Sequence, residues 1–512
     1  MLLFEWILIL LVSAVALTAV ARRLNLPYPS LIALGGTALA FLPNAPEFKL
    51  DPQLTLALFV APVLLDAAFD TSLRDLKRNW IPVLSLVFIA VGITTVAVAW
   101  LVHRMVPGMP WAAAIALGAI VAPPDAAAAS AVLRRLHLPH RMVVILEGES
   151  LLNDATALLV YRIAVGATMG STLSAGSIAP QALAMLGSVV AGFVLAKISI
   201  RLLRGVTDIP SAIVLQFVST FGVWILADKV GLSAIVTLVA YAITASRITG
   251  VTTPARVRLP SYAVWETVVF VLNVLAFVLI GLQLRPILGE LGSDEQDRYL
   301  QIAAAVLGTV VFVRLAWVLT YNRIAWLKVK LLGRGTWPGP QPPTLRGSMV
   351  VSWCGMRGIV TLAAAYALPA DFPFRDLLLL CAFAVVVGTL IFQGLTLRPL
   401  ILAMRLTADN TVDDEVRVAQ VRLAKVAAEV LDGNGSEVAE ILRDEFETPV
   451  AGENGESDGT AQSGRDTRNR LRCQIVAAQR QALMRMRATA EIGDDAFHRI
   501  EERLDWAEVN VR

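Results

Sequence analysis

A short run of polar side chains interrupts an apolar stretch at residues 147–162, which reads EGESLLNDATALLVYR. On a helix, Ser150 and Asp154 lie on one face and Glu149 and Asn153 on the neighbouring face, because residues four apart stand above one another. Carboxylate, hydroxyl and amide oxygens therefore gather on one side of a helix whose remainder is apolar. A solvated helix start is the alternative, but the apolar pattern runs through the motif and disfavours it.

A second run, APPDAAAASAVL, places Asp125 directly after Pro123 and Pro124. Each proline lacks a backbone N–H and clashes with the preceding turn, so we expect the helix to break there and to free carbonyl groups beside Asp125. Asp125 could simply cap the restarted helix. Free carbonyls beside a carboxylate also describe a cation site.

The combined oxygen atoms suit a hard cation such as Na⁺ and include no soft ligand for zinc or copper. We predict that Asp154, Asp125 and Ser150 bind Na⁺, with Asn153 and the carbonyl of Pro124 beside them. Na⁺ and H⁺ each neutralise a buried carboxylate, so the two ions would compete for Asp154. Such competition is a mechanism for exchanging one ion for the other.

A third segment, VSWCGMRGIVTLAAAYALP, carries Arg357 between Gly355 and Gly358. Glycine weakens a helix, so we expect an interruption there as well. Arg357 would offset one buried acid permanently, and Glu149 is the partner that the sequence suggests.

The composition places these segments in a membrane. The chain has 512 residues, 56% of them hydrophobic and 17% charged, with a mean hydropathy of +0.66, whereas soluble domains are about one quarter charged. Apolar stretches recur at the length that crosses a bilayer, about 20 residues. They predict about 13 transmembrane helices, near 2–20, 28–43, 53–70, 80–102, 111–133, 141–165, 180–200, 209–228, 231–248, 261–284, 299–326, 347–369 and 376–403.

The Pro-broken and Gly-weakened helices are each fifth in a set of six, if helices 1–6 and 8–13 form two repeats. Broken helices in corresponding halves indicate an inverted-repeat transporter with its site at the midplane. The expected inner loops hold 18 Lys and Arg residues against six in the outer loops. Because cytoplasmic loops are enriched in Lys and Arg, we expect a multi-pass protein of the cell inner (cytoplasmic) membrane whose N-terminus lies on the outer side.

The last part of the chain differs from the rest. Residues 406–512 hold 14 basic and 22 acidic residues, a net charge of −8, which leaves +11 for residues 1–405. We expect a transmembrane exchanger domain at 1–405 and a cytoplasmic, acidic, α-helical tail at 406–512, with a mobile linker near 448–466. The positive charge of the body fixes its orientation and gives no indication of nucleic-acid binding.

The quoted stretch that runs from the Pro-Pro-Asp motif through GESLLND to Arg162 strongly resembles the cation:proton antiporter-1 family of sodium/proton exchangers. The segments CGMRGIVTLAAAYALP, PVLLDAAFDTSLRDL and WETVVFVLNVLAFVLIGLQL resemble further blocks of that family. The resemblance implies a 13-helix antiporter, a homodimer whose mobile core moves against a dimerisation domain.

Carried over residue by residue, the resemblance makes Asp154 the carrier of the ion and the proton. It makes Asn153 the neighbour that goes with electroneutral exchange, and it pairs Glu149 with Arg357. Asp66 matches an acidic position near the site. Many members have threonine before the aspartate of the fifth span, or proline after it, whereas this chain has Pro124 before Asp125 and Ala126 after it. A threonine hydroxyl is therefore missing while the carbonyl of Pro124 remains, and the preference among Na⁺, Li⁺ and K⁺ stays open.

These observations predict a secondary active transporter that exchanges Na⁺ or Li⁺ for H⁺ and serves pH and sodium homeostasis. It would use no cofactor and would not be an enzyme, since the sequence shows no phosphate loop, nucleophile elbow or HExxH pattern. A K⁺/H⁺ antiporter of the same mechanism is one alternative. A membrane sensor that signals through its tail is another.

Overall fold

The computed structural model describes residues 2–24, 26–42, 51–125, 129, 133, 138–169, 175–203, 205–206, 208–289, 293–333, 343–406, 409–432 and 461–511. Within these residues the ordered structure is helical and contains no strand. Among the described residues, seven helical stretches are long and apolar enough to cross a membrane. They are Pro52–Asp70, Trp80–Met105, Leu183–Leu203, Ile209–Lys229, Ala255–Gly289, Gln296–Leu332 and Arg375–Met404.

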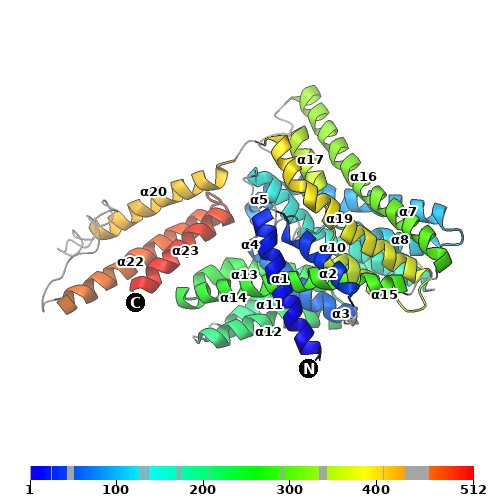
Figure 1. Cartoon of the computed structure of the whole chain (residues 1–512). Helices are drawn as coiled ribbons and strands as arrows, with labels where there is room; N and C mark the ends of the chain where they lie inside the picture. Colours follow the sequence, from blue (N-terminus) through cyan, green and yellow to red (C-terminus); the bar gives the residue numbers. More distant parts are fainter. Residues whose placement is uncertain are drawn as a thin grey trace.

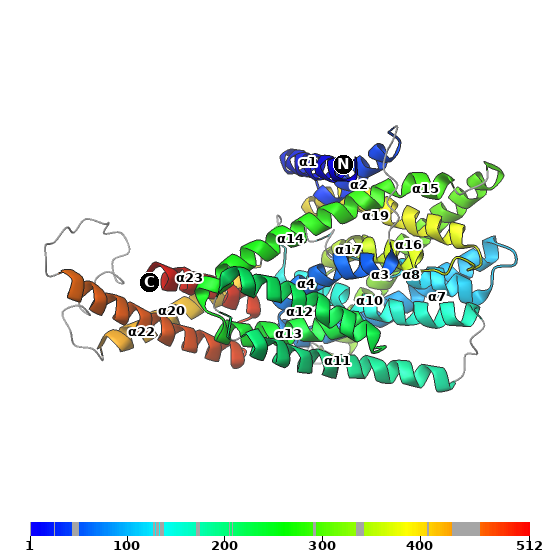
Figure 2. The same cartoon turned by 90° about the horizontal axis from the view of Figure 1, so that it is seen from below.

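The membrane helices pack into two bundles (Figures 1 and 2). The first bundle contains α1 (Leu2–Leu24), α2 (Tyr28–Ala40), α3 (Pro52–Thr55), η1 (Leu56–Val60), α4 (Ala61–Asp70), α11 (Ala175–Leu203), α12 (Ile209–Lys229), α13 (Ala234–Thr252) and α14 (Ala255–Leu282). The second contains α5 (Leu73–Arg78), α6 (Trp80–Leu84), η2 (Ser85–Ala90), α7 (Val91–Met105), α8 (Trp111–Val121), α10 (His140–Thr168), α16 (Ser293–Leu332), α17 (Leu345–Trp353), α18 (Ile359–Tyr366) and α19 (Arg375–Met404). The short helix α15 (Leu284–Gly289) continues from α14 and contacts α2 and α19.

Each bundle is held together by apolar contact and close backbone approach. In the first bundle, α2 and α14 cross where a Cβ added to Gly36 would lie 2.4 Å from the carbonyl oxygen of Val278. A Cβ on Gly281 would lie equally near the carbonyl oxygen of Ala33. Small residues at such crossings let two helices pack backbone to backbone. In the second bundle, α19 is the most deeply buried of the seven stretches.

The described part of the tail contains three helices, α20 (Thr411–Asp432), α22 (Ala461–Ala488) and α23 (Asp494–Val511). They bury a small apolar core of their own that includes Leu423, Leu483 and Phe497. The three helices stand at one end of the membrane bundles, and α23 packs against α14 (Figure 1). Of the linker expected near 448–466, residues 448–460 lie outside the described residues, and α22 begins at Ala461.

Candidate functional site

Two interrupted helices cross inside the second bundle. Helix α8 ends at Val121 and leads into the Pro123–Asp125 segment, while α17 ends at Trp353 and α18 begins at Ile359. Both interruptions lie where proline and glycine predict them. The restarted half-helix expected after Asp125 falls mostly outside the described residues, which include only Ala129 and Leu133 of it.

The two breaks are joined directly to each other. The backbone N–H of Asp125 donates to the carbonyl of Met356 at 2.6 Å. Arg357 donates through Nε to the carbonyl of Val121 at 3.0 Å and through a terminal nitrogen to that of Ala122 at 3.1 Å. These carbonyls lack helical partners because α8 ends there, so the guanidinium satisfies the negative end of a broken helix.

Glycine has a second role in these breaks, which is to leave room for charged groups. A Cβ on Gly358 would lie 1.6 Å from Oδ2 of Asp125, and one on Gly355 would lie 2.3 Å from Cδ of Arg314. Because Gly358 directly precedes α18, the Asp125 carboxylate lies beside the N-terminus of that helix, where the helix dipole favours negative charge.

Helix α10 brings the GESLLND residues to the crossing. Asn153 is fully buried, and its Nδ2 donates to the carbonyl of Pro124 at 2.8 Å. Its Oδ1 is buried and accepts no hydrogen bond from the described residues. Asp154 is 8% exposed and interacts electrostatically with Asp125. The structure thus gathers Asp125, Pro124, Asn153 and Asp154 at one place, as the sequence predicts.

The partner of Glu149 differs from the expected one. Glu149 forms a two-point ion pair with Arg314 of α16, at 2.5 and 2.8 Å, and both side chains are at most 3% exposed. Arg314 also donates to the carbonyls of Ser352 at 3.1 Å and Val351 at 3.2 Å, next to the second break. The predicted pairing of Glu149 with Arg357 is therefore replaced by one with Arg314, because Arg357 is engaged by backbone carbonyls.

The two remaining predicted residues lie on helices α10 and α4. Ser150 is partly buried on α10, one turn before Asp154. Asp66 is partly buried on α4, a helix of the first bundle that packs against α10. Of the predicted set, Asp66 is the member that the first bundle contributes.

Comparison with known proteins agrees with this architecture. Residues 7–403 match the family described as "Sodium/hydrogen exchanger, transmembrane". The chain belongs to this family. The sequence resemblance to sodium/proton antiporters is thus confirmed, and the family is one of transporters and not of enzymes.

This exchanger-family chain is similar to three further proteins over most of its length. The uncharacterized Na(+)/H(+) exchanger YjcE of Escherichia coli is 28% identical, and the match covers 98% of this chain and 97% of YjcE. The sodium, potassium, lithium and rubidium/H(+) antiporter of Bacillus subtilis is 26% identical over 98% of this chain and 77% of its own length. The antiporter MjNhaP1 of Methanocaldococcus jannaschii, a solved structure, shares the fold with a TM-score of 0.61 and 18% identity, over 79% of this chain and 98% of MjNhaP1.

Sequence reasoning did not assign Arg314 to the site of this exchanger-family chain. The available signal was its position, since Arg314 is a charge within the apolar eleventh stretch. Charges at that depth are costly and are usually paired. Arg162, Arg314 and Arg357 all met this description, and the sequence offered no measure of which one packs against Glu149.

Proposed function

We propose that this chain exchanges Na⁺ or Li⁺ for H⁺ across the cytoplasmic membrane, one for one. It would do so as a homodimer of 13-helix protomers built from inverted repeats, with the N-terminus outside and the tail in the cytoplasm. Family membership supports cation/proton antiport in general. The ion and the stoichiometry are our inference from the residues at the crossing of the two breaks. The orientation is our inference from the excess of Lys and Arg in the expected inner loops.

The observation that carries this proposal is the assignment of the buried arginines. Arg314 is paired with Glu149, and Arg357 is engaged by the carbonyls that end α8. Neither arginine is left as a permanent counter-ion for Asp154, although Asp154 is buried. A carboxylate in a low-dielectric site is stable only when its charge is neutralised, so Asp154 would require a mobile cation or a proton.

The surrounding oxygens suit a cation in that position. Oδ1 of Asn153 accepts no hydrogen bond from the part of the chain that the structure describes, and its amide nitrogen donates to the carbonyl of Pro124. Together with Asp125 and Ser150, these groups offer hard oxygen ligands to a dehydrated Na⁺. Binding Na⁺ and binding H⁺ would each neutralise Asp154, so the loaded protein would change its access while the empty anion would not. Movement of one bundle against the other provides that change of access.

K⁺ remains a second candidate ion. The B. subtilis relative is named for sodium, potassium, lithium and rubidium. A sensor that binds the cation without transporting it is the third reading, and tail movement without ion flux would favour it.

The test is dissipation of an imposed pH gradient in everted vesicles on addition of Na⁺, Li⁺ or K⁺. Asp154→Asn should abolish the response to every cation while the protein stays in the membrane. Asp228→Asn provides the matched control, because Asp228 is an aspartate whose side chain is 49% exposed on α12. Exchange by Asp154→Asn at the wild-type rate would refute the role of Asp154.

A further inference from the structure

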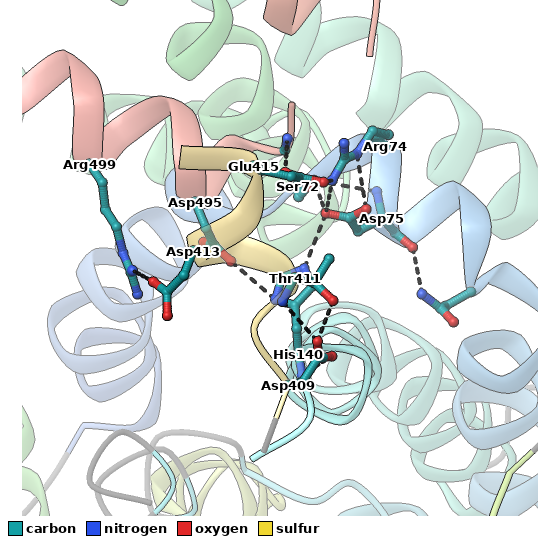
Figure 3. A network of polar contacts seen from close by, with 12 residues as sticks. Ser72, Arg74, Asp75, His140, Asp409, Thr411, Asp413, Glu415, Asp495 and Arg499 are labelled. Atoms are coloured by element: carbon teal, nitrogen blue, oxygen red, sulfur yellow. Dashed lines mark hydrogen bonds and ion pairs between the residues drawn. The ribbon is translucent and has the colours of Figure 1, made fainter. Parts of the chain in front are cut away.

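The two ends of the membrane bundles are held in different ways. At the tail end, where the tail packs, Arg74 of α5 binds Glu415 of α20 at 2.7 Å (Figure 3). Arg258 of α14 donates to Asp505 of α23 at 2.6 Å, and both side chains are buried. Arginine is charged at every pH of interest, so these contacts tie the tail to both bundles constantly. At the far end, where α15 lies, the bundles meet without the tail (Figures 1 and 2).

A hydrogen bond joins the two bundles directly at the far end. The hydroxyl of Tyr366, the last residue of α18, donates to Oε1 of Gln283 at 2.7 Å. Gln283 follows the last residue of α14 and is 4% exposed. Because α18 belongs to the second bundle and α14 to the first, this bond holds the two bundles in one register at the far end.

A narrow cavity lies between the bundles beside this bond, and most of its walls are apolar. Leu279 and Ile280 of α14 line one side, and Ile359, Leu362 and Ala363 of α18 line the other. Apart from Ile359, these side chains are buried. A hydrated cation would lose its water against such groups without gaining a ligand, which is unfavourable. These five residues, the apolar layer, therefore form a barrier to ions.

The apolar layer lies between the ion site and the hydrogen bond. Ile359 directly follows Gly358, where a Cβ would lie 1.6 Å from Oδ2 of Asp125. Tyr366 stands seven residues after Ile359, about 10 Å further along the axis of α18. Helix α18 thus forms one continuous wall from the Asp125 carboxylate to the bond with Gln283.

Polar side chains lead from the ion site in the other direction. Ser150 and Glu147 precede Asp154 by four and seven residues, so the three share a face of α10. Ser150 and Glu147 are partly exposed. The first residue of α10, His140, contacts Asp495 of α23 at the tail end. The ion site is therefore bordered by polar groups towards the tail and by the apolar layer towards the far end.

Other contacts between the bundles at the far end do not fix their register in the same way. Helix α15 packs against α19, and Ile287 of α15 is buried. Apolar contact is non-directional, so two helices can slide without losing it. Arg162 of α10 and Asp228 of α12 face each other at 4.0 Å, but both side chains are exposed and water screens the pair. The bond between Tyr366 and Gln283 combines direction with burial.

The place of this bond suits a contact that breaks and re-forms. Arg285, two residues after Gln283, is exposed, and so is the residue after Tyr366. Water can therefore hydrogen-bond to both groups once they separate, and neither is left buried without a partner. Separation of Glu149 from Arg314 would instead leave two unpaired charges in an apolar interior.

We propose that Tyr366 and Gln283 form the gate that closes the ion site at the far end, and that this gate opens once in each exchange cycle. With the bond formed, the apolar layer is held together and the ion site is reached from the tail end. With the bond broken, α18 parts from α14 and a cation passes between them to Asp125. This inference rests on the proposed function, and it names the place at which the two bundles separate.

A reversible cross-link between the two gate positions tests this directly. Gln283→Cys and Tyr366→Cys are combined in the full-length protein with Cys473→Ser, and Cys354 and Cys381 are buried. A short bifunctional methanethiosulfonate then joins the two new thiols through disulfides. Vesicles with the cross-linked protein should lose exchange, because α18 can no longer part from α14. Reduction with dithiothreitol should restore the rate measured before cross-linking.

The matched control places the same cross-link inside one bundle. Tyr28 of α2 and Phe270 of α14 both belong to the first bundle, and their ring centroids lie 5.9 Å apart. Tyr28→Cys with Phe270→Cys should exchange cations equally well before and after cross-linking, because no step of the cycle separates these two helices.

A second measurement detects opening of the gate without transport. Ala363 lies in the apolar layer and is 2% exposed, so a hydrophilic maleimide should label Ala363→Cys slowly in lipid nanodiscs. Adding Tyr366→Phe removes only the hydroxyl and should raise the labelling rate roughly threefold, the effect of one hydrogen bond between membrane helices. Tyr161→Phe is the matched control, a buried tyrosine of α10 within the second bundle, and should leave the rate unchanged.

The two measurements separate this inference from the proposed function. Exchange by the cross-linked protein at the rate measured before cross-linking would overturn the gate, as would a folded Tyr366→Phe whose labelling rate equals that of the wild-type sequence. If Tyr366→Phe raises the labelling rate but none of Na⁺, Li⁺ and K⁺ drives exchange by the wild-type protein, the proposed function fails and the gate stands.

Discussion

The structure pairs Glu149 with Arg314, whereas the sequence suggested Arg357 as the partner. Measurements of stability can distinguish these two pairs. Arg314→Ala leaves Glu149 buried, charged and unpaired, and it removes donors from the carbonyls of Ser352 and Val351. Breaking a buried ion pair by removing one partner costs about 3–5 kcal/mol of stability. We expect Arg314→Ala to lose about this much free energy of unfolding.

Adding Glu149→Gln to Arg314→Ala should restore about 2 kcal/mol or more, because the uncompensated charge disappears and only neutral hydrogen bonds are still missing. Arg357→Ala should also be destabilising, since it frees the carbonyls of Val121 and Ala122. Glu149→Gln should not rescue it, because Glu149 keeps its partner Arg314 and the two carbonyls remain without a donor.

The assay is a double-mutant cycle on the purified protein, with free energies of unfolding from denaturant titration in mixed micelles. The coupling free energy between positions 149 and 314 should be about 2 kcal/mol or larger, and it should exceed that between 149 and 357, because Glu149 forms an ion pair with Arg314 but acts on Arg357 only through its charge. A larger coupling for the pair 149 and 357 would refute this reading of the structure.

Two further predictions concern the crossing of the broken helices. Gly358→Ala should abolish transport without loss of the protein from the membrane, because its Cβ would occupy the place of the Asp125 carboxylate. The control is Gly222→Ala, whose Cβ meets nothing within 4 Å and which should transport normally. Asn153→Asp should make exchange depend on membrane potential, because a second negative charge would lie beside Asp154. Exchange that does not depend on the potential, in vesicles clamped with valinomycin and K⁺, would contradict the link between Asn153 and electroneutral exchange.

The breaks in α8 and between α17 and α18 could be predicted from sequence because their causes are local. Proline removes a donor from its own residue, and glycine weakens its own turn. The crossing of the two segments could not be predicted in the same way. The bond from Asp125 to Met356 joins residues 231 positions apart, and no local preference encodes such a contact.

The ion-pair partners of the basic residues could be predicted from sequence even less well than the helix crossing. Arg258 and Arg74 looked like ordinary basic residues of inner loops, whose number indicates orientation. In the structure Arg258 is buried against Asp505, and Arg74 binds Glu415. The sequence showed that the tail is acidic, but the pairing depends on how α20 and α23 pack against the body.

The contact between Arg258 and Asp505 also sets an order of events during synthesis. The two residues are 247 positions apart, and a ribosome that adds about 5–20 residues per second needs roughly 12–50 s to cover that distance. Throughout this interval, the first turn of α14 carries an arginine whose acidic partner does not yet exist. Completion of the final helix is therefore the step that closes this surface, and a nascent chain arrested before α23 presents an uncompensated cation at the membrane boundary for quality control to detect.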